Sequence, residues 1–222
     1  MNNTAQNFQH DFDKPSDILA QCTLFKQQEI AHLNHSIIKR FGSPSQPIYI
    51  DQSNVEINGI QYDSPLILPI VNGQLEIVQC AVLQDAKRIS IIPDGLAKGF
   101  ARYGDFDHAK PVIITYNLEA FFKIAQTDYA VVLVILPTLC NASLTQLKPF
   151  DFEQIQFVIH QLSKAGYTQL YLPVRPEHIQ LEAFQSLEKN TPVRLLNQYQ
   201  KIMDAEFLTE LLKTDRKEEV TA

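Results

Sequence analysis

Residues 111–136 read PVIITYNLEAFFKIAQTDYAVVLVIL, and this stretch decides the fold. Within it, residues 112–116 are a β-rich run and residues 117–125 have helical spacing. Residues 130–136 are an unbroken apolar run, which predicts a strand buried on both faces, as is typical of parallel sheets. A strand, a helix and a buried strand in succession predict a βαβ unit.

The chain that follows continues this alternation. Residues 151–165 are amphipathic with a helical period, and Gly166 directly after them predicts the end of that helix. A strand, a helix, a strand and a helix are then predicted at residues 169–174, 176–189, 193–196 and 205–213. We therefore predict an α/β fold, in which a parallel sheet is flanked by helices.

The residues before the βαβ unit have a different pattern. Short β-rich runs begin at Ile48, Val55, Leu66, Leu75 and Arg88. Asn-Gly pairs at residues 58–59 and 72–73 separate some of these runs, and Asn-Gly is a strong signal for a tight hairpin. This part of the chain is predicted to form a small antiparallel β meander.

The N-terminal part is predicted to be helical. Residues 16–40 carry apolar side chains at helical spacing, and residues 41–47 interrupt that pattern with one glycine and two prolines. We expect an arm and a hinge there. The predicted organisation is an N-terminal helical arm at 1–45, a β-rich subdomain at 46–110, an α/β domain at 111–213 and a flexible tail at 214–222.

The composition of the 222 residues is that of a globular protein. The hydrophobic fraction is 45% and the charged fraction is 20%, which excludes a long disordered chain. The formal net charge is −6 and the pI is about 5.5. The overall field therefore does not attract phosphate, and nucleic-acid binding needs a local basic patch.

The sequence favours a cytoplasmic location. The polar N-terminus lacks the features of a secretory signal, and no window approaches the ~20 apolar residues of a membrane helix. Cys22, Cys80 and Cys140 are odd in number and widely spaced, which suggests neither a disulfide framework nor a metal site. His32 and His35 have no further ligand spaced with them. A Walker-type phosphate loop and a dinucleotide fingerprint are absent, so no cofactor is expected.

A block of short motifs precedes the βαβ unit. It consists of a hydrophobic-Pro-hydrophobic run at 66–70, a Gly-x-Leu turn at 73–75, the pair Val78-Gln79, an Asp-Ala-Lys-Arg turn at 85–88 and Gly-Leu-Ala-Lys-Gly at 95–99. The block resembles one in primases of phages, satellite phages and plasmids, where it precedes a Toprim (topoisomerase–primase) domain. His35–Gly42 is similar to a segment that often comes before it. The resemblance covers roughly residues 33–185 and implies a primase-like subdomain followed by a Toprim-like domain.

The chain departs from that family at the positions of its catalytic carboxylates. Where the family has a glutamate followed by glycine after the first Toprim strand, this chain has Tyr116 and Asn117. Pro137 occupies the place of an aspartate, and Arg175 and Glu177 occupy the place of an Asp-x-Asp pair. A phenol with a pKa near ~10 is a poor base at neutral pH. A guanidinium would also repel Mg²⁺. The resemblance therefore implies a pseudoenzyme without catalytic residues, metal or cofactor.

Basic residues suggest where nucleic acid would bind. The candidates are Lys87, Arg88, Lys98, Arg102 and Arg175. Lysine and arginine beside glycine-rich turns suit phosphate, because the backbone N–H groups there are open to close approach. The alternative is that these are solvated turn residues of an acidic protein, with nearby aspartates cancelling part of the charge.

These observations leave three functional hypotheses. The first is a catalytically degenerate, primase-like Toprim protein linked to DNA replication and to a mobile genetic element or prophage. It would bind single-stranded DNA or RNA and work with a replication protein partner, without any membrane. The second is a protein-interaction or inhibitory factor on the same scaffold, which the net charge of −6 favours. The third is an active nucleotidyl transferase with relocated carboxylates such as Glu119 or Glu177.

Overall fold

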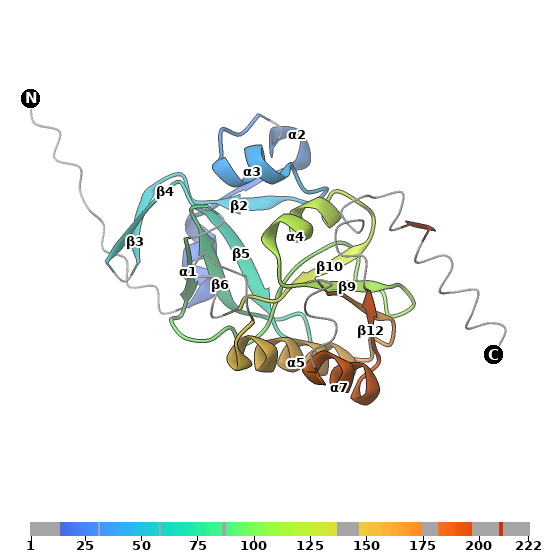
Figure 1. Cartoon of the computed structure of the whole chain (residues 1–222). Coiled ribbons are helices and arrows are strands. Elements are labelled where there is room, and N and C mark those ends of the chain that lie inside the picture. Colours follow the sequence, from blue (N-terminus) through green and yellow to red (C-terminus); the bar gives the residue numbers. More distant parts are fainter. Residues whose placement is uncertain are drawn as a thin grey trace, which may run out of the picture.

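The computed structural model describes residues 14–30, 32–57, 59–85, 88–136, 147–174, 182–196 and 209–210. It mixes helices and strands, with two antiparallel sheets and a third that is mostly parallel (Figure 1). The predicted succession of an antiparallel β region and a parallel α/β region is confirmed at this level.

The described helices are α1 (Pro15–Gln21), α2 (Gln27–Ile30), α3 (Ser36–Phe41), α4 (Leu118–Ile124), α5 (Pro149–Lys164) and α7 (Glu182–Asn190). The strands of the β-rich half are β1 (Thr23–Phe25), β2 (Ile48–Ile50), β3 (Asn54–Ile57), β4 (Ile60–Asp63), β5 (Leu66–Val71), β6 (Ile77–Leu83) and β7 (Ile89–Ile92). The remaining strands are β8 (Ala101–Tyr103), β9 (Val112–Thr115), β10 (Ala130–Leu133), β11 (Leu170–Pro173) and β12 (Val193–Leu196).

The first sheet is antiparallel and has the order β1-β2-β5-β6-β7. Its centre is the pair β5–β6, whose register runs from Leu66 opposite Leu83 to Val71 opposite Ile77. The predicted strands that begin near Ile48, Leu66 and Arg88 are confirmed as β2, β5 and β7. Sequence reasoning missed β4, which pairs with β3 in a separate two-stranded sheet.

The two Asn-Gly pairs behave differently. Between β3 and β4, Ile57 lies opposite Ile60 and Gly59 has a φ of +75°, so this tight hairpin is confirmed. Between β5 and β6 the connection is longer. Here the side-chain oxygen of Asn72 accepts two backbone N–H groups of the loop at 3.0 and 3.1 Å, and Leu75 takes the positive φ of 64°.

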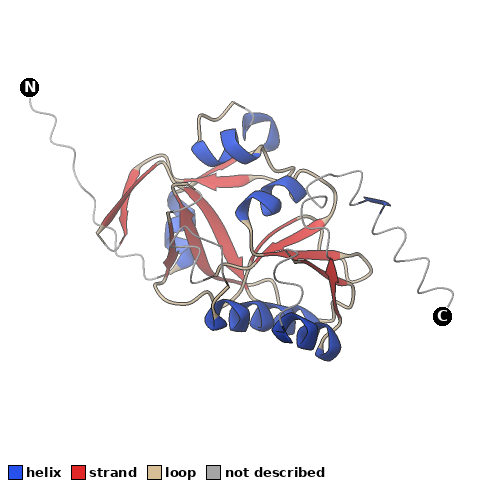
Figure 2. Ribbon diagram, viewed as in Figure 1, coloured by secondary structure: helices blue, strands red, loops and turns tan. Residues whose placement is uncertain are grey.

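The prediction of one continuous N-terminal helical arm is wrong. The structure divides this region into α1, β1, α2 and α3 (Figure 2). The strand β1 has the sequence Thr-Leu-Phe, and β-branched and aromatic residues suit a strand. It pairs antiparallel with β2, from Thr23 opposite Ile50 to Phe25 opposite Ile48. Pairing with the edge of β2 therefore makes Thr23–Phe25 a strand despite the helical spacing of its apolar residues.

The second sheet has the order β12-β11-β9-β10-β8 and is parallel except for β8. Every residue of β9, β10 and β11 is buried, as the apolar runs predicted. The predicted strand at 193–196 is confirmed as β12. The predicted strand at 130–136 pairs as a strand only to Leu133, although residues 134–136 are also buried.

Helices cover both faces of the second sheet. Helix α4 lies on one face, and α5 and α7 lie side by side on the other (Figure 1). The connection from β9 to β10 and the connection from β10 to β11 run in opposite directions along the sheet, so right-handed crossovers place their helices on opposite faces. The predicted helix at 151–165 is confirmed as α5, which begins at Pro149; the predicted helix at 205–213 lies almost wholly outside the described residues. Within the described ranges, no helix has the length and apolar character needed to cross a membrane.

A short backbone junction joins the two sheets. The N–H of Val71 at the end of β5 donates to Phe100 at 2.9 Å, and the N–H of Phe100 donates back at 3.0 Å. A Cβ on Gly99 would lie 2.0 Å from the Val71 carbonyl oxygen, so only glycine fits there. Buried residues of both sheets form one core cluster. The division into four segments stays a prediction, and β8 lies within 46–110 while pairing in the second sheet.

His35 caps α3 with its imidazole ring. Its Nδ1 accepts the backbone N–H of Ile37 at 3.2 Å, and the side chain is buried. Burial lowers the pKa of His35 from its ordinary value of 6.5, while the nearby Ser64 backbone opposes this shift. The cap also needs Nδ1 without a proton. The folded state therefore holds His35 neutral.

We expect His35 to make the fold less stable in acid. Because its folded pKa lies below 6.5, the unfolded chain binds the proton more readily, so this contribution to stability is complete above that value and is lost as pH falls through the folded pKa. Denaturant unfolding at pH 7.5 and pH 5 measures this loss. His35→Asn, which can still cap the helix, should reduce the pH dependence. His32→Asn, at an exposed position, should leave it unchanged. Equal pH dependence in both variants would contradict the assignment.

Candidate functional site

The order of strands in the second sheet reverses at β9. The chain passes from β9 to β10 on one side, and then crosses to β11 on the other side of β9. In open α/β sheets, ligands bind beyond the carboxyl ends of the strands at such a reversal. The ends of β9 and β11 are therefore the first place to look for a site.

The two strands separate at this end. Their parallel pairing covers two residues of each strand and ends at Tyr171. The N–H of Val174 donates to Leu196 of β12 at 2.9 Å, so the nitrogen of the preceding Pro173 faces β9. Proline has no N–H, and the ladder between β9 and β11 cannot continue past it. The sheet opens here because Pro173 has no N–H to continue the ladder with β9.

The described residues at these strand ends are buried and mostly apolar. Thr115 and Tyr116 are buried at the end of β9, as are residues 134–136 after β10 and Val174 after β11. The side-chain oxygen of Asn117 accepts a backbone N–H of α4 at 2.9 Å and caps that helix. Within the described ranges, no three His, Cys, Asp or Glu side chains are grouped as a metal site would require.

Several predicted residues lie outside the described part of the chain. They are Lys87, Pro137, Arg175 and Glu177. Glu119, considered above as a relocated carboxylate, is exposed on α4. What the described strand ends offer is a packed apolar surface with the buried phenol of Tyr116.

The three described basic candidates lie in different settings. Arg88 is exposed before β7, and its Nη1 lies 3.4 Å from the carbonyl oxygen of Gln61 in β4. Lys98 is exposed in the loop that leads from β7 to β8. Arg102, on β8, is half-buried, and its guanidinium carbon lies 4.8 Å from the centre of the Phe106 ring.

Glutamine side chains hold the loop that carries Lys98. Gln79, buried on β6, donates to two carbonyl groups of the loop at 3.1 and 3.3 Å and accepts the Lys98 N–H at 2.7 Å. From α5, Gln154 and Gln161 each donate to a further carbonyl group, at 2.7 and 3.1 Å. The loop is therefore fixed to the first sheet and to the helix layer of the second.

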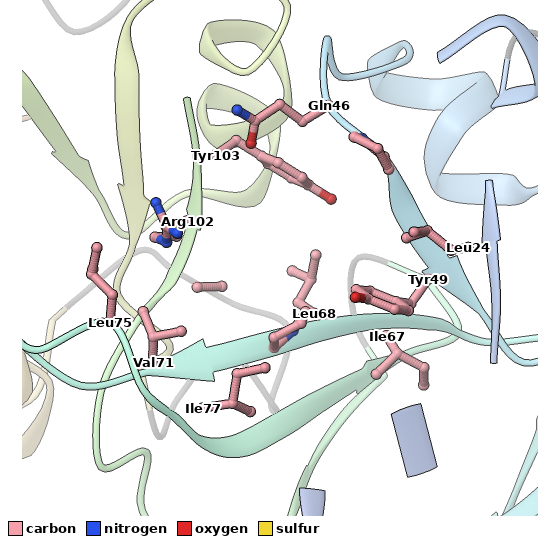
Figure 3. Close-up of a pocket in the computed structure, with 13 residues that line it drawn as sticks. Leu24, Gln46, Tyr49, Ile67, Leu68, Val71, Leu75, Ile77, Arg102 and Tyr103 are labelled. Carbon is pink, nitrogen blue, oxygen red and sulfur yellow. The ribbon is translucent and has the colours of Figure 1, made fainter. Parts of the chain in front are cut away.

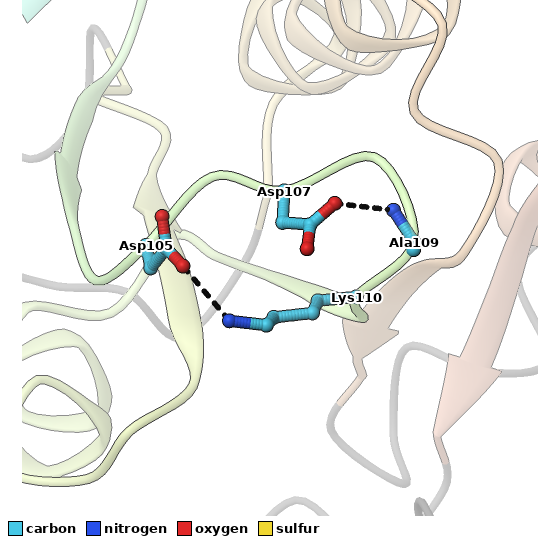
Figure 4. Close-up of polar contacts among 4 residues, drawn as sticks. All are labelled: Asp105, Asp107, Ala109 and Lys110. Carbon is cyan, nitrogen blue, oxygen red and sulfur yellow. Dashed lines mark hydrogen bonds and ion pairs between the residues drawn. The ribbon is translucent and has the colours of Figure 1, made fainter.

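Acidic residues follow β8. Asp105 forms an ion pair with Lys110 at 2.8 Å, and Asp107 accepts a backbone N–H of its own loop at 3.0 Å (Figure 4). The hydrogen bond that Lys110 donates to the Asp105 carboxylate raises the pKa of Lys110. Burial raises the pKa of Tyr167, Arg102 lowers it, and the two aspartates raise it. These carboxylates therefore act on the same ring as Arg102 and weaken the attraction of this surface for phosphate.

A groove of about 350 Å³ lies between the first sheet and β8 (Figure 3). Its lining is mostly apolar and comes from β1, β2, β5, β6 and β8. Leu24 and Ile77 belong to this lining although 46% and 47% of their surfaces are exposed. Large apolar side chains gathered at an open cavity are typical of binding surfaces.

The groove exists because two strands lose their neighbours. Strand β2 pairs only with Leu66 and Ile67 of β5, so the later residues of β5 have no β2 partner on that side. Phe100 pairs with Val71 of β5, and the chain then continues as β8 alongside β10. A wedge opens between β5 and β8 beyond this junction.

Polar side chains converge in the apolar groove. Figure 3 shows the hydroxyl groups of Tyr49 and Tyr103 turned toward the space between β8 and the first sheet, with Gln46 beside Tyr103. None of the three side chains makes a hydrogen bond to another described residue. Tyr103 is only 6% exposed, its ring packs on Phe121 at 5.1 Å, and burial raises its pKa. A few such polar groups in an apolar cavity characterise ligand sites.

No sequence pattern predicts this groove. Leu24 lies in a stretch predicted to be helical, and Ile77 lies in a run predicted only to be a strand. No local pattern marks either residue as exposed, because their exposure depends on which strands become neighbours. The prolines and glycine of residues 41–47 indicated a break before β2, but not a cavity.

The comparisons with known proteins identify no relative of this chain, so a functional assignment rests on its own residues. No family model matches the chain, and neither the curated proteins nor the solved structures yield a match. The resemblance to phage and plasmid primases therefore stays an expectation from the short motifs.

We expect the glutamine-held loop to contribute measurably to stability. Gln154→Ala removes the donor to the buried Ala97 carbonyl and should lower the free energy of unfolding by about 1–3 kcal/mol. The matched control is Gln156→Ala, an exposed position on the same helix, which should change it by no more than about 0.5 kcal/mol. Denaturant titrations compare the two variants. Equal effects would show that the hydrogen bond to the loop contributes nothing.

Proposed function

We propose that this chain is a protein-interaction factor without metal-dependent catalysis, and that the groove between the first sheet and β8 is its binding surface. The observation that carries the proposal is the exposure of Leu24 and Ile77 around an apolar cavity into which the Tyr103 hydroxyl points. Exposed apolar surface beside polar groups that have no hydrogen-bond partner among the described residues supports a role in binding.

The absence of catalysis is part of the same proposal. Tyr116 is buried and the Asn117 side chain caps α4, so neither replaces a carboxylate at the end of β9. The Toprim-like identity, and with it the link to replication or to a mobile element, rests on the resemblance of the short motifs. We also propose a cytoplasmic location, which the free thiols of Cys22 and Cys80 support.

We expect partner binding to depend on the rim of the groove. When the chain is used as bait in a lysate of cells that carry its gene, it should capture a partner protein. The double variant Leu24→Ser/Ile77→Ser should not capture that protein. The control Ile60→Ser/Leu96→Ser changes two other exposed apolar residues and should keep it. With purified components, the groove variant should bind at least about tenfold more weakly by calorimetric titration. Retention by both double variants would contradict the proposal.

Nucleic-acid binding is the second candidate function. The observation that favours it is an exposed lysine, Lys98, on a loop whose backbone is fixed by glutamine side chains. A fixed cationic loop with flanking glycines suits a phosphate backbone. Under this proposal Lys87, Arg88, Lys98, Arg102 and Arg175 contact single-stranded DNA or RNA, together with a replication protein partner.

Salt dependence tests this second candidate. If the chain binds single-stranded DNA, Arg88→Ala/Lys98→Ala should weaken binding and reduce the slope of log K against log salt by about 1–2. Lys26→Ala/Lys39→Ala removes the same charge from exposed positions elsewhere and serves as the control. Fluorescence anisotropy measures both variants. The absence of binding at low salt, or equal effects of the two variants, would exclude these residues as a nucleic-acid site.

A further inference from the structure

Among the described residues, β8 is an edge strand that pairs only with β10, so its other side faces the groove without a partner strand. Phe100 exchanges both of its backbone hydrogen bonds with Val71, so its N–H and C=O point away from β10. The corresponding groups of Arg102, two residues later, point the same way. The pairing with β10 agrees, because Val134 donates to β9 and Val132, two residues earlier and opposite Arg102, is therefore also turned away from β8. The N–H and C=O of Arg102 thus face the groove.

The opposite wall cannot form a complete ladder. Val71 directs its backbone groups toward β8, so Pro69, two residues earlier on β5, faces the same side. Pro69 offers a carbonyl group but has no N–H. A peptide strand that enters the wedge would therefore form its paired hydrogen bonds with Arg102 on β8. Its side chains would meet the apolar lining.

The lining fits an apolar side chain and the peptide groups beside it. A volume of about 350 Å³ is at the lower end of the range for small ligand sites. Leu24 and Ile77 offer apolar contact at the rim. The hydroxyls of Tyr49 and Tyr103 and the amide of Gln46 are able to bond the amide groups of an extended segment.

The charge within the groove favours an acidic neighbour, because Asp105 and Asp107 act on the Tyr167 ring but do not line the groove. Arg102 is the one ionised side chain in its lining, which includes no aspartate or glutamate among the described residues. The contact with the Phe106 ring restrains the guanidinium, so less side-chain entropy is lost when it binds a carboxylate. Charge complementarity at this end therefore favours an anion.

We infer that the groove binds an extended segment of a partner protein in which a large apolar residue neighbours an acidic one, and that this segment adds a strand to β8. Strand addition of this kind derives affinity from the backbone and specificity from side-chain pockets. The inference rests on the proposed interaction function and states the chemistry of the partner at that same groove.

The experiment titrates the full chain with two fluorescent hexapeptides, observed by anisotropy. One has a single aspartate beside leucines in a serine and threonine background, and the other has asparagine in place of the aspartate. The aspartate peptide should bind with a Kd of about 10–100 µM and about tenfold more tightly than the asparagine peptide. Arg102→Gln should abolish this preference, whereas Arg88→Gln should keep it.

Two further variants separate binding from folding. Ile77→Ser should weaken the aspartate peptide about tenfold, whereas Ile60→Ser, a similarly exposed isoleucine, should not. Tyr103→Phe keeps the ring that packs on α4 and removes only the hydroxyl, and should weaken binding about threefold. In nuclear magnetic resonance spectra, the backbone amide signal of Arg102 should shift on peptide addition.

Several results would overturn the inference. Equal binding of the two peptides, or binding that is unaffected by Ile77→Ser, would do so. Amide shifts confined to other surfaces would also overturn it. So would self-association that Ile77→Ser abolishes, because a second copy would then occupy the groove. If the peptides fail while partner capture still depends on Leu24 and Ile77, the chemistry of the segment is wrong and the interaction function stands. If capture is also independent of the groove, both are wrong.

Discussion

Two backbone hydrogen bonds between Val71 and Phe100 determine how the rest of the molecule is arranged. They bring the end of β5 beside the residue before β8, and they require glycine at position 99 because the chains approach so closely. From this point the two sheets share one core but diverge in direction. The groove opens beyond this junction, between β5 and β8.

At the carboxyl ends of the second sheet, β9 and β11 separate, but the described side chains there are buried and mostly apolar. Pro173 stops the ladder between β9 and β11 at the place where α/β sheets usually bind ligands. The described residues around that opening are nevertheless buried and mostly apolar. Apolar strand ends stabilise a fold, whereas the clustered carboxylates of a metal site repel one another until an ion binds. The described strand ends are therefore packed like a hydrophobic core, although they stand where α/β sheets usually place a binding site.

Sequence reasoning succeeded where local pattern and tertiary neighbours agree. The buried strands of the second sheet were predictable because an apolar run of that length has few other solutions. The strand β1 was not, because its partner β2 is remote in sequence. The groove depends entirely on strand order, which no local pattern encodes. Two residues of the motif block at 66–99 have structural roles: Gln79 holds the loop that carries Lys98, and Gly99 allows the close approach of Val71, which explains their presence without any catalytic role.

The brevity of β8 has a consequence for solubility. An exposed strand edge is a template for uncontrolled pairing, and long flat edges promote fibres. Strand β8 is three residues long, and the facing strand β5 has an imino acid at the same level. Such an edge offers too few successive donors and acceptors to propagate a stack of identical chains. The same brevity would keep a bound guest exchangeable, because it could never be held by more than a few hydrogen bonds.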